Sequence, residues 1–298
     1  MRGPVLDREE YIEQEYFFRA YRERLIENVP SQEILQTIHE EILATTRLPM
    51  AIDFMRTEIM HSGRISDAMA RLPHYFAPFQ AFVISRAEDD DSRFEQQIAL
   101  RVLESEARYR SHHPTMAGLF VYQLECLARN RLGYTDGLKA MSGDPLFTDD
   151  WTHWILRLQN ELGGLELAEI IYRASQHFQN KRTTRQAMST PGIAAQSSAE
   201  SERANAVPAT LFGDQEGRIA KANIGRDPLY FFAALQRQLD YPAVPRSTHA
   251  AETEKLPGFL EARLNKIEQR LKLSEMESKG GIDLTRFYTK PDEGPPAI

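Results

Sequence analysis

The chain has 298 residues, of which 42% are hydrophobic and 27% charged, and its formal net charge at pH 7 is −7. This length fits one large or two modest domains, and the composition is that of a globular protein rather than a disordered or collagen-like one. The acidic balance excludes a nucleic-acid-binding protein that relies on its overall charge, so we expect no nucleic-acid partner. The single cysteine, Cys126, excludes an intrachain disulfide and favours a reducing, cytoplasmic location.

The apolar segments are short. The longest nearly apolar stretch, residues 76–84, covers nine residues, whereas a helix that spans a bilayer needs about 20. The first residues, "MRGPVLDREEYIEQ", turn acidic early and contain no apolar core, so we expect no secretory signal. We therefore expect no membrane span and a cytoplasmic protein, which could lie at the periphery of the inner membrane.

The N-terminal segment, residues 1–30, reads as one amphipathic helix. Asp7 and Glu10 form a capping-box pattern, and apolar residues then recur on one helical face as far as Leu25. Pro30 disfavours helical geometry in the residue before it, so we expect the helix to stop there.

Residues 31–110 read as a first bundle of helices. Ser31 is a good N-cap for the helix that follows. Pro49 either kinks that helix or opens another, and Gly63 can terminate it. A Pro- and Phe-rich elbow, an apolar helix and an acidic tip at residues 89–91 come next, before a long amphipathic helix. Residues 31–110 contain more helix-start and helix-stop signals than the other segments of the chain.

Residues 111–180 read as a second bundle. It contains three amphipathic segments, and Gly163 and Gly164 separate the last of them from the one before. Runs of alternating β-branched residues with hairpin turns are nearly absent throughout. We therefore predict an all-α fold of two tandem helical bundles.

The remainder of the chain differs in composition. Residues 181–226 are rich in Ser, Thr, Ala and Gln, which predicts a flexible linker. Within residues 227–298, Asp227 and Pro228 are good signals for the start of a helix. A last helix spaces four apolar residues by 4, 3 and 4, as in a short coiled coil: Leu260, Leu264, Ile267 and Leu271.

Two short segments suggest that the bundles are related. "ILATTRL" at 42–48 and "CLARNRL" at 126–132 share leucine, alanine, arginine and leucine at matching offsets. Each is followed by a short apolar segment and later by a glycine before a new amphipathic stretch, Gly63 in the first and Gly164 in the second. This order predicts two copies of one helical unit.

The motifs of the first bundle resemble the type II secretion system F-protein family. "GRISDAM" from Gly63, "LPHYFAPF" from Leu72 and "ISRAE" ending at Glu88 take the places of the family's Gly-x-x-Leu/Ile-Ser-x-Ala, Pro-x-x-Phe-x-Pro and Gly-Glu-x-x-Gly motifs. Ala87 and Asp91 replace the two glycines of the last motif, and the membrane-spanning segments of the family are missing. The resemblance implies a relative of the cytoplasmic bundles, which contact other components such as the assembly ATPase and catalyse no reaction.

The sequence offers no catalytic, cofactor or metal site. "HEEIL" from His39 lacks the second histidine of a zinc-binding helix, because Leu43 stands in its place. The acidic tip at residues 89–91 lacks the alternating ligands and the central glycine of a calcium loop. Cys126 lies in an apolar helical stretch and is expected to be a small core residue.

We therefore expect a non-enzymatic interaction or scaffold protein that binds protein partners, such as the assembly ATPase or platform components. The candidate partner-binding residues are Glu88, Asp89, Asp91, Leu264, Ile267 and Leu271. The three apolar residues of this set could form a homo-oligomer through the last helix or pack back on the bundle. Two alternatives stay open: a structural subunit of a larger assembly, and a helical enzyme or ligand-binding protein whose site carries no motif.

Overall fold

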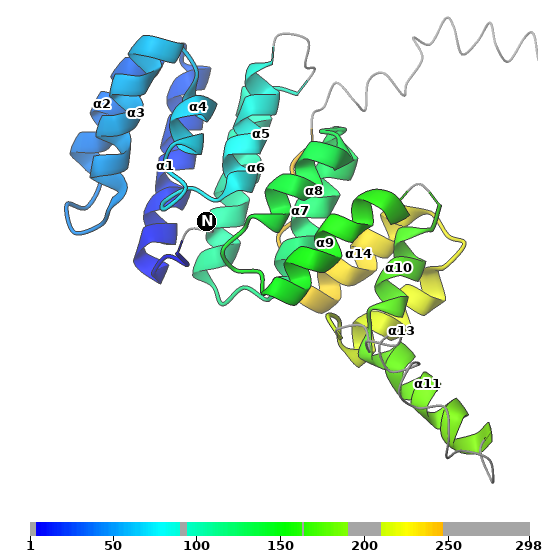
Figure 1. Cartoon of the computed structure of the whole chain (residues 1–298). Helices are drawn as coiled ribbons and strands as arrows, with labels where there is room; N and C mark the ends of the chain where they lie inside the picture. The colour runs from blue at the N-terminus through cyan, green and yellow to red at the C-terminus, as the bar shows by residue number, and fades with distance from the viewer. Residues whose placement is uncertain (1–3, 90–93, 163, 190–209, 247–298) are drawn as a thin grey trace, which may run out of the picture. The chain divides into compact units, whose positions relative to one another are not determined.

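The structure is a computed structural model, and it describes residues 4–89, 94–162, 164–189 and 210–246, with the backbone alone for 185–189. Within these residues the chain forms helices and no strand, which confirms the predicted all-α class (Figure 1). One isolated bridge, between Ser175 and Phe212, joins the segments that precede two of the helices.

Thirteen helices lie in the described residues. They are α1 (Arg8–Ile26), α2 (Ser31–Glu41), α3 (Leu48–Ser62), α4 (Ile65–Ala70), α5 (Pro78–Glu88), α6 (Gln96–Ser111), α7 (Met116–Asn130), α8 (Tyr134–Ser142), α9 (Asp149–Glu161), α10 (Leu167–Arg173), α11 (Gln176–Ser189), α13 (Asp214–Asn223) and α14 (Pro228–Leu239).

Helices α1 to α6 pack around aliphatic and aromatic side chains. α1 lies along α6, and α2 and α3 form a hairpin beside α1 (Figure 1). Phe17, Phe18 and Tyr21 of α1 are buried, and their helical spacing brings the rings together on the face that meets the core. Gly63 ends α3 with a φ of 71°, a left-handed conformation that suits glycine, as the sequence predicts.

Helices α7 to α10, α13 and α14 pack around a second group of rings. α7 lies against α14, α8 against α9, and α10 against α13. Phe120, Trp151, Trp154 and Phe212 meet edge to face, with ring centres 4.9 to 6.1 Å apart. Contacts of this geometry add about 0.5–1.5 kcal/mol each to the gain from burial. These rings and those of α1 belong to one continuous core.

The N-terminal helix, α1, packs mainly against α6. One expected segment differs from the structure. The segment expected to be a flexible linker, 181–226, is helical at 181–189 in α11 and at 214–223 in α13, while 190–209 lie outside the described residues. α13 turns small residues, Gly217 and Ala220, toward the core, so its sequence carries little hydrophobic signal.

The two segments behind the predicted repeat lead into different structures. Residues 42–48 lie between the end of α2 and the first residue of α3, whereas residues 126–132 cover the end of α7 and the two residues after it. From there to Gly63 the chain forms α3 alone, whereas from there to Gly164 it forms α8 and α9. The tandem relation of the bundles therefore stays a prediction.

The chain divides by its contacts into residues 1–247 and residues 248–298, and the second unit lies outside the described residues. Among the described helices, none is both long and apolar enough to cross a membrane.

Candidate functional site

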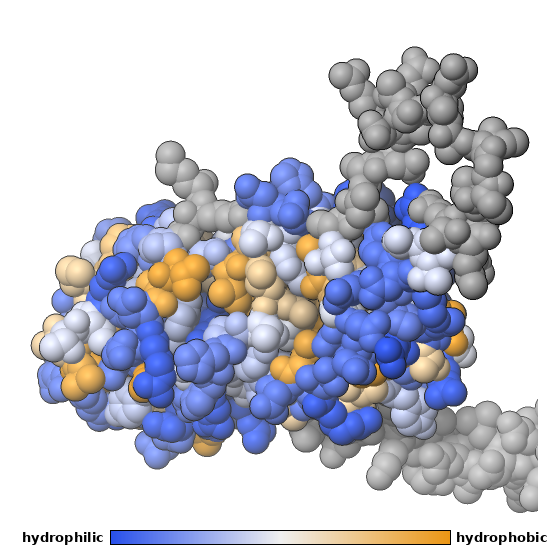
Figure 2. Space-filling view, turned by 90° about the horizontal axis from the view of Figure 1, so that it is seen from below, coloured by the Kyte–Doolittle hydropathy of each residue, from blue (hydrophilic) through white to orange (hydrophobic). Residues whose placement is uncertain are grey.

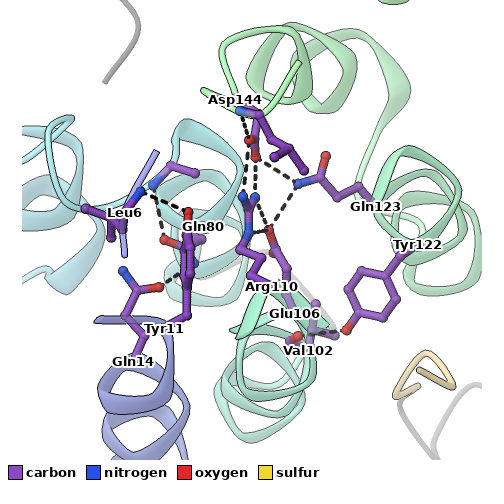
Figure 3. A network of polar contacts seen from close by, with 12 residues as sticks. Leu6, Tyr11, Gln14, Gln80, Val102, Glu106, Arg110, Tyr122, Gln123 and Asp144 are labelled. Atoms are coloured by element: carbon purple, nitrogen blue, oxygen red, sulfur yellow. Dashed lines mark hydrogen bonds and ion pairs between the residues drawn. The ribbon is translucent and has the colours of Figure 1, made fainter. Parts of the chain in front are cut away.

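Three charged side chains meet in the core where α6, α7 and the loop after α8 converge (Figure 3). Arg110 donates from Nε to Glu106 Oε1 at 2.9 Å and from Nη1 to Asp144 Oδ1 at 3.2 Å. Gln123 of α7 donates its amide N–H to Glu106 Oε1 at 3.1 Å and to Asp144 Oδ2 at 3.3 Å. The side chain of Arg110 is 2% exposed and the two carboxyl groups are 0% exposed. We call these four residues the polar core.

The polar core holds two carboxyl groups and one guanidinium group. Burial raises the pKa of Glu106, and Glu106 Oε2 has no hydrogen-bond partner in the described structure. Burial would lower the pKa of Arg110, but the carboxylates of Asp144 and Glu106 raise it well above its ordinary value. Burial therefore disfavours a charge on Glu106, while Arg110 and Asp144 form a buried ion pair.

The polar core has a structural role. Asp144 also accepts from the backbone N–H of Leu146 at 3.0 Å, so the same carboxylate shapes the loop between α8 and α9. The guanidinium carbon of Arg110 lies 5.8 Å from the ring centre of Tyr11, which brings α1 to the same point. The residues thus connect α1, α6, α7 and the loop, and neither of the two cavities described below is lined by them.

Glu88, predicted as a partner contact, binds within the chain. Its Oε1 accepts from the backbone N–H of Ile65 at 2.7 Å, and its Oε2 accepts from the backbone N–H and the hydroxyl of Ser66 at 3.1 and 2.5 Å. These backbone groups open α4, where helix N–H groups lack partners of their own. The carboxylate therefore caps α4, and Arg64 lies beside it at 3.7 Å.

The other predicted partner-binding residues divide into two groups. The carboxylate of Asp89 is 39% exposed and pairs with Arg64 at 2.9 Å and with Arg86 at 3.3 Å. The remaining four lie outside the described residues: Asp91, Leu264, Ile267 and Leu271.

The other candidates from the sequence have internal partners. His39 lies 3.4 Å from Asp53 of α3, and Leu43 is exposed. Cys126 is fully buried, and burial raises the pKa of its thiol well above the ordinary value, as expected for a core cysteine. Among the described residues, no group of three or more His, Cys, Asp and Glu side chains could hold a metal ion.

An open apolar cleft of about 630 Å³ lies among α9, α10, α11 and the ends of α13. We call it the α9–α10 cleft, and its lining residues are Trp154, Arg157, Glu161, Leu165, Glu169, Ile170, Tyr172, Arg173, Ala174, Phe178, Leu211 and Ile224. Tyr172 and Phe178 meet edge to face with ring centres 5.3 Å apart, and both are only partly buried. Ile224 is 40% exposed.

Charged residues surround the apolar part of the α9–α10 cleft. Arg173 pairs with Glu169 on α10. Arg157 and Glu161 of α9 make no ion pair with any described residue, although one helical turn separates them. A partner that enters the cleft therefore meets aromatic rings, one free cation and one free carboxylate.

The rest of the surface is less distinctive. A second cavity of about 640 Å³ lies between α2 and α3, and its lining is mostly polar, including Gln36, Asp53 and Arg56. On the face seen in Figure 2, apolar residues form small separate groups within a largely hydrophilic surface. Groups of this size are normal for a protein surface.

Sequence reasoning missed both the polar core and the cleft. The spacing of Glu106 and Arg110, one helical turn apart, is visible in the sequence, but nothing marks Asp144 as their partner. The cleft draws on the segment expected to be a linker, so no pattern predicts it. No family model, curated protein or solved structure matches the chain.

Proposed function

We propose that the protein is a non-enzymatic interaction protein that binds an amphipathic helix of a protein partner in the α9–α10 cleft. The observation that carries the proposal is the cleft itself, with partly exposed rings beside two charges that are free in the described structure. Aromatic side chains are frequent anchors of protein interfaces because they bury much area with little loss of conformational freedom.

The charges of the cleft define the chemistry of this partner. Arg157 and Glu161 lie one turn apart on α9, so they would pair with an acidic and a basic residue one turn apart on the bound helix. The apolar face of that helix would lie over Ile170, Phe178 and Ile224, as in other helix-in-groove complexes. Complementary charges of this kind set the orientation of the partner more than its affinity.

A photo-crosslinking amino acid at position 224 tests the proposal in cells. We expect it to capture one protein through a peptide that forms an amphipathic helix, while the same amino acid at Met50, exposed on the distant α3, does not capture it. The identified partner is then purified and its dissociation constant measured. Arg157→Glu should weaken binding roughly tenfold, and exchanging the facing acid of the partner for lysine should restore it. Full affinity in Arg157→Glu would contradict the proposal.

The resemblance to secretion platform proteins supports a finer proposal. It makes the assembly ATPase or another platform component the first partner to try, and it would place the protein at the inner membrane by contact with that machine. The direct test is titration of the purified ATPase. Binding of the ATPase that requires the α9–α10 cleft would support the finer proposal. Absence of binding would contradict it, and the partner of the cleft would then be a different protein.

A second candidate, a ligand-binding protein, is favoured by the size of the cleft. A volume of about 630 Å³ lies within the usual range of roughly 300–1,000 Å³ for small-molecule sites. Trp154 lines the cleft, and its ring centre lies 5.6 Å from that of Trp151. These are the only two tryptophans of the chain. Tryptophan fluorescence should therefore change when an apolar ligand enters. The candidate would be excluded if no apolar ligand in a screen changes the tryptophan fluorescence. It would also be excluded if a ligand changes the fluorescence of the Ile170→Glu variant as much as that of the unchanged protein.

A further inference from the structure

α11 and α13 begin side by side at the bridge between Ser175 and Phe212. Gly217 of α13 allows the close approach, because a Cβ atom there would lie 2.3 Å from the hydroxyl oxygen of Ser175. The first turns of the two helices are joined by His177 and Asp214, whose Nδ1 and Oδ1 are 2.8 Å apart. The side chains that follow on the two helices are therefore brought together.

Those side chains are cationic. Lys181 follows His177 by one turn on α11, and Lys221 follows Gly217 by one turn on α13, so the packing of the two first turns brings both ammonium groups to the same side of the helix pair. In agreement with this, the neighbouring Lys221 amine lowers the pKa of the Lys181 ammonium below its ordinary value. Arg218 lies close enough to act in the same direction, and Asp214 acts in the opposite one. We call Lys181, Lys221, Arg218 and Asp214 the basic cluster.

The charge of the basic cluster is not balanced within the described structure. Asp214, its one carboxylate, already binds His177 through Oδ1 and Arg218 through Oδ2, the latter at 2.6 Å. The sequence of α11 contains no Asp or Glu, and Glu216 of α13 accepts a hydrogen bond from Gln238 of α14. Three cations therefore face one carboxylate in a chain whose formal net charge is −7.

We propose that Lys181, Lys221 and Arg218 bind a phosphate group. Ammonium groups held on the same side of two packed helices repel each other, and an anion placed between them turns that repulsion into attraction. A phosphomonoester carries close to two negative charges at neutral pH and has three acceptor oxygens, one for each cation. Ammonium and guanidinium groups are the usual protein ligands of phosphate. This site is separate from the α9–α10 cleft and does not depend on the function proposed for it.

The test is a titration of the full chain with inorganic phosphate at constant ionic strength. The lysines carry ¹³C-methyl groups, which keep their charge and report the pKa of each amine by NMR. We expect the signals of Lys181 and Lys221 to shift with one saturating curve and the pKa of Lys181 to rise. Lys139, the other lysine of the described chain, should not respond, and chloride should have no effect. Absence of saturation, or an equal response of Lys139, would overturn the proposal.

The double variant Lys181→Gln, Lys221→Gln gives the second measurement. By calorimetry its dissociation constant for phosphate should rise roughly tenfold or more, while Lys139→Gln should match the unchanged protein. All three positions are exposed, so the variants should fold, and circular dichroism checks this. An unchanged dissociation constant in the double variant would refute the assignment.

The source of the phosphate group is a separate arm. Vesicles of phosphatidylcholine with and without phosphatidic acid present the same phosphomonoester on a lipid. Binding that requires phosphatidic acid and is lost in the double variant would support the site with a lipid headgroup as ligand. Binding of free phosphate without binding to either vesicle would support it with a small phosphate compound. Failure of both would overturn it.

Discussion

The polar core and the basic cluster are opposites in composition and in surroundings. In the polar core, two carboxyl groups share one guanidinium, and all three side chains are at most 2% exposed. In the basic cluster, three cations share one carboxylate at the surface. Water can hydrate the excess charge of the second group but not of the first, so burial raises the pKa of Glu106 in the polar core.

The difference in burial and charge balance suggests a structural role for the polar core and a binding role for the basic cluster. The polar core ties helices together and leaves no polar group exposed for a ligand. The basic cluster leaves positive charge that no carboxylate among the described residues balances. A buried charged group is therefore weak evidence of a binding site in this molecule, and an unbalanced surface group is stronger evidence.

Arg110→Ala should have the largest effect. It leaves Asp144 buried without its cation, which costs about 3–5 kcal/mol of unfolding free energy in comparable cases. Urea denaturation followed by circular dichroism measures the loss. Arg108→Ala is the matched control on the same helix, because Arg108 is 55% exposed and pairs with Glu15, and its cost should be at most about 1 kcal/mol. Equal losses of unfolding free energy in the two variants would show that the buried arginine of the polar core contributes no more to stability than an exposed one.

Glu106→Gln should stabilise the protein at neutral and alkaline pH. Because the folded-state pKa of Glu106 is raised, its contribution is fully present below the unfolded-state pKa and is lost as pH rises through the folded-state value. The glutamine variant has no such loss, so its unfolding free energy at pH 8 should exceed that of the unchanged protein, with the difference vanishing near pH 4. Urea midpoints over this pH range give the comparison. Lower stability of the variant at every pH would mean that Glu106 is ionised.

Glu88→Ala tests a carboxylate that lies between these extremes. Its side chain is 12% exposed and receives three hydrogen bonds at the start of α4, so its loss should cost about 1–2 kcal/mol, as for other helix caps. Asp89→Asn, at a 39% exposed carboxylate, should cost less and serves as control. A loss of partner binding without a loss of stability would instead support Glu88 as a contact residue.

Lys181→Gln should have the smallest effect and the opposite sign from Arg110→Ala. Removing one of two neighbouring cations relieves their repulsion, so the urea midpoint should rise slightly at low salt. High salt screens that repulsion and should abolish the difference. A fall in the midpoint at low salt would show that Lys181 is balanced by a neighbour.

Some of the helix ends carry strong local signals and others do not: Asp7 makes no side-chain capping bond at the start of α1, and Ser31 is the first residue of α2 rather than its N-cap. Asp227 caps α14 through its side chain and Pro228 opens the helix, as expected from the sequence, and Gly63 closes α3. α13 was not predicted because it lies in a segment whose composition is typical of a linker, and its buried side is formed by small residues, Gly217 and Ala220.

The sites were less predictable than the helices. The polar core depends on Asp144, 34 residues after Arg110, and the cleft on Leu211 and Ile224, which flank the unpredicted α13. Proximity of this kind comes from packing over long sequence distances, which periodicity along the chain does not encode. The resemblance to platform proteins likewise concerns helix order and gives no information on either site.

The contacts that the residues after α14 make with α7 determine where the chain can be truncated. Tyr241 donates its hydroxyl hydrogen to Glu125 at 2.7 Å, and Asn130 donates to the carbonyl of Pro245 at 3.0 Å. Glu125 is 2% exposed, so a protein trimmed after Leu239 would leave that carboxylate with an empty space beside it. Trimming beyond residue 246 keeps both of these hydrogen bonds to α7.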